Sequence, residues 1–106
     1  MDFMGMIKQA QAMQAKMQEA QAELETTFVE GEAGGGVVKV TLTAKGALQK
    51  VSIDKGLLKP EEGEILEDLI VSAHAQARAK AEAAMTEKMK AITGGLQLPP
   101  GMKLPF

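Results

Sequence analysis

The chain has 106 residues, of which 45% are hydrophobic and 25% are charged, and its formal net charge is −2 at pH 7. It holds no Cys and one His, which excludes a disulfide scaffold, a Cys-ligated zinc site, an iron–sulfur cluster, thiol catalysis and a multi-His metal site. A chain of this length folds as one domain with a modest core, which leaves little room for a large enclosed active site.

The sequence contains no segment typical of a membrane span or of export. No stretch approaches the ~20 apolar residues that cross a bilayer, and residues 1–8 lack the apolar run of a signal peptide. We therefore expect a soluble cytoplasmic protein with no membrane partner.

Residues 1–25 are predicted to form a helix. Apolar residues recur at steps of three and four from Phe3 to Leu24, which is an unbroken heptad seam over three repeats. The remaining positions are mostly Gln, Lys, Glu and Ala, which favour a helix. The seam is thin, because Ala and Met occupy sites where a strong coiled coil has Leu and Ile.

Residues 26–54 are predicted to form a three-stranded antiparallel sheet. β-branched and aromatic residues begin at Thr26, and a glycine cluster from Gly31 to Gly36 indicates a flexible connection between strands. From residue 37 to 43 the chain alternates, and the buried face of this strand is expected to carry Val38, Val40 and Leu42. In the last strand, alternation sets Gln49, Val51 and Ile53 on one face and Leu48, Lys50 and Ser52 on the other.

Residues 60–92 are predicted to form a long second helix. Pro60 suits the first helical position, and the acidic residues after it suit the positive N-terminal end. Apolar residues then recur at helical spacing from Leu66 to Ile92. Gly94–Gly95 ends the pattern, and the prolines that follow predict an extended tail over residues 94–106. The fold class is thus α+β.

Both predicted helices are too long for the sheet. A helix of ~22 residues is ~33 Å long, whereas three strands span only ~15 Å in width and ~23 Å in length. The overhanging apolar seams need a partner, and a second copy of the chain is the simplest one, so we expect a homodimer. The expected dimer interface comprises Leu66, Leu69, Ile70, Ala73, Val38 and Val40.

No pattern for catalysis or for a cofactor is present. The glycine cluster has Val37 where a phosphate-binding loop needs Lys, and a strand rather than a helix follows it. The acidic run from Glu61 is typical of a helix N-terminus, and His74 has no second His or Cys to act with. We expect no catalytic residue, metal, cofactor or small-molecule substrate.

Several short motifs, each weak alone, occur in a characteristic order and spacing: Met6–Met17, Gly35–Thr41, Val51–Asp54 with Leu57–Leu58, Leu66–Ile70 and Leu98–Phe106. Through these motifs the chain resembles the YbaB/EbfC nucleoid-associated proteins of bacteria over almost its whole length. It implies a tweezer-like homodimer with helices projecting from a central sheet, and binding to double-stranded DNA in the nucleoid that alters DNA conformation. Nucleoid organisation, gene regulation and DNA protection are the roles that it implies.

Few cations on the helices can reach DNA phosphates. They are Lys8, Lys16, Arg78, Lys80, Lys88 and Lys90. The four on the second helix do not form one row at 100° per residue, and no groove-reading motif is present, so we expect binding to the DNA backbone with little sequence selectivity. The alternative is a dimeric adaptor for DNA-repair or replication factors, which would bind protein through Met-lined helix surfaces.

Overall fold

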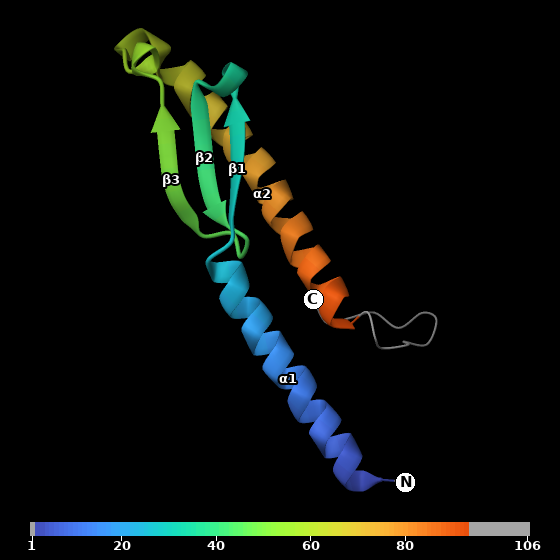
Figure 1. The fold of residues 1–106 in the computed structure, drawn as a ribbon. Helices are drawn as coiled ribbons and strands as arrows, with labels where there is room; N and C mark the ends of the chain where they lie inside the picture. Colours follow the sequence, from blue (N-terminus) through green and yellow to red (C-terminus); the bar gives the residue numbers. More distant parts are fainter. Residues whose placement is uncertain (1, 94–106) are drawn as a thin grey trace.

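A computed structural model describes residues 2–93 of the chain. Its helices and strands are α1 (Phe3–Glu25), β1 (Phe28–Ala33), β2 (Val38–Thr43), β3 (Leu48–Ile53) and α2 (Gly63–Thr93). The strands form one antiparallel sheet in the order β1-β2-β3. Figure 1 shows α2 running along one face of the sheet while α1 projects from one end of it. The α+β class and the order of helix, sheet and long helix are confirmed; the predicted tail, residues 94–106, lies outside the described residues.

The main core lies between β2 and α2. Val38, Val40 and Leu42 alternate along β2 and are almost completely buried, as the period of two predicts. They pack against Ala73 and Ala77, whose small side chains let the helix axis approach the sheet closely.

Gly31 lies directly beneath α2. A Cβ built on this residue would stand 2.2 Å from the carbonyl oxygen of Ala73 and 2.4 Å from the backbone nitrogen of Ala77. Gly31 is therefore a packing residue of β1, and its assignment to the flexible connection is wrong. The connection itself is Gly34–Gly36, where all three residues have positive φ, a conformation that favours glycine.

A second, smaller core joins the two helices. Ala20 and Leu24 near the end of α1 are buried against Met89 of α2 and Ala44 of the β2–β3 turn, and Met17 packs at the margin. The helices run antiparallel, and α1 continues well past the end of α2 (Figure 1). The chain is accordingly elongated, with principal extents of 71 × 27 × 16 Å.

The faces of β3 differ from those that simple alternation predicts. A register shift beside Thr41 leaves Gln49 as an extra residue in β3 and sets Leu48 opposite Leu42. Leu48 therefore lies on the side of the sheet that faces α2, and the prediction that it shares a face with Lys50 is wrong.

Side chains of α2 form hydrogen bonds with the β1 edge of the sheet, whereas α2 does not lie across β3. On the β1 edge, the Gln76 side-chain oxygen accepts a hydrogen bond from the backbone N–H of Glu32 at 2.7 Å, and Lys80 Nζ donates to the carbonyl oxygen of Glu30 at 2.8 Å. These contacts occupy backbone groups through which a further strand would pair. Among residues 2–93, α2 lies across β1 and β2 rather than β3, so no helix of this part of the chain covers the β3 edge.

Candidate functional site

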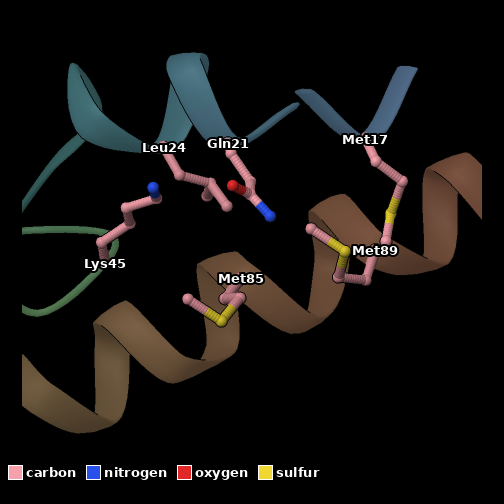
Figure 2. Close-up of a pocket in the computed structure, with 6 residues that line it drawn as sticks. All are labelled: Met17, Gln21, Leu24, Lys45, Met85 and Met89. Atoms are coloured by element: carbon pink, nitrogen blue, oxygen red, sulfur yellow. The ribbon is translucent and has the colours of Figure 1, made fainter. Parts of the chain in front are cut away.

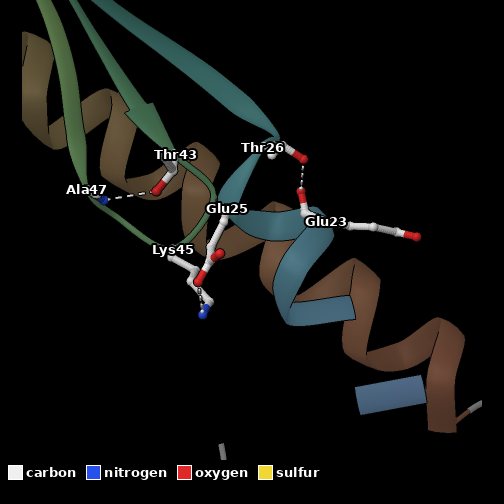
Figure 3. A network of polar contacts seen from close by, with 6 residues as sticks. All are labelled: Glu23, Glu25, Thr26, Thr43, Lys45 and Ala47. Carbon is white, nitrogen blue, oxygen red and sulfur yellow. Dashed lines mark hydrogen bonds and ion pairs between the residues drawn. The ribbon is translucent and has the colours of Figure 1, made fainter. Parts of the chain in front are cut away.

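A polar junction fixes the direction in which α1 leaves the sheet. The hydroxyl groups of Thr26 and Thr27 both donate to the carbonyl oxygen of Glu23 in the last turn of α1, at 3.1 and 2.8 Å. Lys45 in the β2–β3 turn pairs with Glu25 at 3.1 Å, as Figure 3 shows. The backbone N–H of Ala44 donates to the carbonyl oxygen of Thr27 at 2.8 Å. The turn therefore holds the base of α1, and with it the placement of the side chains further out.

Lys8 and Lys16 lie on the projecting part of α1. Both side chains are exposed, and neither forms an ion pair or hydrogen bond with any of residues 2–93. Their eight-residue separation corresponds to ~80° around the helix and ~12 Å along it. Both ammonium groups can therefore meet an external anion without first breaking an internal contact.

The four cations of α2 have different surroundings. Arg78 Nε lies 3.6 Å from Glu82 on the exposed surface, a contact worth well under ~1 kcal/mol. Lys80 bonds to the β1 backbone as described above, and Lys88 pairs with Glu23 across the two helices. Lys90 is exposed and makes no ion pair with the described residues. Lys90 and Arg78 are thus available to a ligand, whereas Lys80 and Lys88 make contacts that stabilise the fold.

The residues expected at the dimer interface do not share one kind of environment. Val38, Val40 and Ala73 are buried within a single chain, with at most 1% of each exposed. They belong to the core, and a second copy cannot touch them without opening the subunit. Leu66, Leu69 and Ile70 are half-buried and pack against that core.

A different apolar surface is exposed on the helix side of β3. It consists of Leu48, Val51 and Ile53 on β3 and Val71 on α2, and we call it the β3 shelf. Leu48, Val51 and Val71 are 58%, 39% and 68% exposed. Val71 lies two helical turns before Arg78, which lines a small cleft with the β2–β3 turn, so it faces the same flank of α2. The sequence does not predict this surface, because the bulge that turns Leu48 toward it has no clear sequence signal.

A cleft of about 290 Å³ separates the ends of the two helices. Figure 2 shows Met17, Gln21 and Leu24 from α1 facing Met85 and Met89 from α2, with Lys45 at one end. The lining is mostly apolar and carries neither a carboxylate nor an imidazole, so it offers no acid–base pair.

Two further features bear on the class of function. Among residues 2–93, no group of three or more His, Asp or Glu side chains is arranged to hold a metal ion. Within the same residues, neither helix combines the length and apolar character needed to cross a membrane.

Comparison with known proteins gives a consistent family assignment. The model of the YbaB/EbfC DNA-binding family matches residues 1–96. A nucleoid-associated protein of Methylocella silvestris is 60% identical over 105 residues, which is 99% of this chain and 98% of that protein. One from a Bradyrhizobium species is 64% identical over 100 residues, 94% of each chain. The crystal structure of an uncharacterized protein from Helicobacter pylori shares the fold, with a TM-score of 0.78 at 23% identity over 89% of this chain and 99% of that one.

Proposed function

Because this chain belongs to the YbaB/EbfC DNA-binding family, we propose that it acts as a homodimer that binds double-stranded DNA with little sequence selectivity and alters the conformation of the DNA. The family match over residues 1–96 is the observation that carries the proposal, and the names of the relatives agree with it. The family is one of nucleoid-associated proteins rather than enzymes. We infer from the same names that the protein works in the nucleoid, and hence in the cytoplasm, in nucleoid organisation, gene regulation or DNA protection.

The β3 shelf supports the homodimer part of the proposal. Its exposed apolar side chains lie beside a sheet edge that no other strand among residues 2–93 pairs with, and a two-fold axis next to β3 would bring two copies of the shelf together. Such a dimer would leave both α1 helices projecting, as the tweezer-like arrangement requires.

The exposed lysines of α1 support contact with the DNA backbone. Lys8 and Lys16 are exposed cations that pair with none of residues 2–93, they lie on a helix that projects from the body of the protein, and a dimer presents two copies of each. Phe3 is the single aromatic residue in the two helices, which leaves little for intercalation between base pairs. Phosphate contacts position a protein on DNA but do not read its sequence, so low selectivity follows.

The double variant Lys8→Ala/Lys16→Ala is expected to weaken binding to all duplexes equally. It removes four cations from a dimer, and each lost phosphate contact lowers the magnitude of the salt slope by about 0.9. A mobility-shift titration on unrelated duplexes at several salt concentrations measures both effects.

The matched control is Lys39→Ala/Lys50→Ala, which removes the same number of charges from the outer face of the sheet. We expect it to retain binding, and sedimentation should show that both variants remain dimers. Loss of binding in this control but not in the α1 variant would assign the DNA contact to the sheet and contradict the proposal.

A further inference from the structure

The apolar seam of α1 is covered by α2 along only part of its length. Leu24 and Ala20 are buried against α2, whereas Phe3 and Met6 further out are 73% and 53% exposed. Ile7, which flanks the seam, is 42% exposed. Residues three and four apart are neighbours on a helix, and exposed apolar neighbours of this kind mark an interaction surface. We call Phe3, Met6, Ala10 and Met13 the outer seam.

The inner part of the seam shows which shape of partner this face accepts. There, α2 runs antiparallel to α1 (Figure 1), and Lys88 pairs with Glu23 across the two helices. Met17 packs against the small core that the two helices share. A helix in the antiparallel direction therefore fits the seam, and α1 of a second copy is a helix that carries the same seam.

We propose that the outer seams of two copies pair antiparallel about a two-fold axis at Lys8. This register sets Phe3 opposite the partner's Met13 and Met6 opposite the partner's Ala10. A large side chain then meets a small one on both sides of the axis, which lets the two helices approach closely. The overlap stops before Met17, which already packs against the core shared with α2.

Charges on one flank of the seam fit this register. Asp2 and Lys16 each precede a seam residue by one position, so they lie on the same flank of α1. Helical side chains lean toward their own N-terminus, so Asp2 and the partner's Lys16 lean toward each other. Neither forms an ion pair with any of residues 2–93. An exposed pair of this kind is weak, so it favours the register without withdrawing Lys16 from DNA.

The pairing joins different dimers. Its axis crosses α1 at right angles at Lys8, which lies ~26 Å along the helix from Glu25, at the end of α1 next to the sheet. The dimer proposed above has its axis beside β3, so each dimer offers both of its outer seams to other dimers. The contact is only ~15 Å long, and small interfaces are weak. Pairing therefore occurs at high protein concentration and leaves the dimer intact at micromolar concentration.

Disulfide trapping tests this register, because the chain has no natural Cys. The variants Met6→Cys and Ala10→Cys are mixed at high concentration and oxidised, and one of them carries a mass tag that identifies the mixed product. The matched control is Met6→Cys mixed with Ala12→Cys, since position 12 lies 200° around the helix from position 10. The mixed product of positions 6 and 10 should form at least ~10-fold faster than the control product.

Light scattering of the trapped product then shows which copies pair. Four or more chains per particle are expected. The mixed product from a protein that is monomeric before oxidation would support the seam and contradict the β3 shelf alone. The proposal is overturned by a mixed product that forms no faster than the control, or by faster self-crosslinking of Met6→Cys, which indicates parallel helices. Two chains per particle from a protein that is dimeric before oxidation would also overturn it, because the pair would then lie within one dimer.

Discussion

The variant Gly31→Ala is expected to be strongly destabilised. Its new methyl group would stand 2.2 Å from the carbonyl oxygen of Ala73, and 2.4 and 2.9 Å from the backbone nitrogen and Cα of Ala77. These are backbone atoms of α2 and cannot rotate away, so the helix must move off the sheet and loosen the core on β2. Overpacking of this kind costs about 3 kcal/mol, and thermal unfolding should occur about 10 °C or more below the wild-type midpoint.

The matched control for this variant is Gly63→Ala at the start of α2. Apart from the residue itself, its chain neighbours and the backbone of its own helix, no described atom lies within 4 Å of the position where its Cβ would be built, and its φ of −57° and ψ of −46° are helical. Alanine is favoured over glycine in a helix by up to ~1 kcal/mol, so the melting temperature should stay constant or rise. Equal melting temperatures for the two variants would contradict the close approach of α2 to β1.

The variant Val71→Asp is expected to separate the dimer into folded monomers. Val71 is 68% exposed within one chain, so a carboxylate there stays hydrated in the monomer and leaves the subunit intact. In a dimer formed through the β3 shelf, the same carboxylate loses water without gaining a partner. A cost of about 3 kcal/mol raises the dissociation constant more than ~100-fold.

Sedimentation velocity at micromolar concentration measures this change. Wild-type protein should sediment at twice the chain mass and Val71→Asp at the chain mass, with an unchanged helical circular dichroism spectrum. Thr86→Asp places the same charge on an exposed position of α2 outside the shelf and should remain dimeric. A dimeric Val71→Asp variant would exclude the shelf as the interface.

The sequence predicts those elements whose hydrophobic period is long and regular. The seam from Phe3 to Leu24 and the alternation of Val38, Val40 and Leu42 each specify one element with one apolar face. Such a pattern does not say what covers the face. The pattern predicts Val38 and Val40 at the dimer interface, but α2 of the same chain buries them, because the helix can approach the sheet over its own alanines.

Contacts between segments that are distant in the sequence cannot be predicted from hydrophobic periodicity. Helical angles show that the four cations of α2 point in different directions, yet not that Lys80 reaches the Glu30 carbonyl oxygen or that Lys88 reaches Glu23. The packing role of Gly31 has no sequence signal either. A glycine so close to Gly34–Gly36 looks like part of the same turn until the position of α2 is known. The set of DNA-contacting residues stays a prediction. Within that set, the structure leaves Lys8, Lys16, Arg78 and Lys90 available to a ligand.

The salt dependence of DNA binding by the wild-type dimer tests the central claim most directly. With about four phosphates engaged, the logarithm of the affinity should fall with log[salt] at a slope near −3.6, using about −0.9 per phosphate. Duplexes of unrelated sequence should give the same slope and closely similar affinities. Absence of detectable binding at low salt would contradict DNA binding by this chain and favour a dimeric adaptor for proteins.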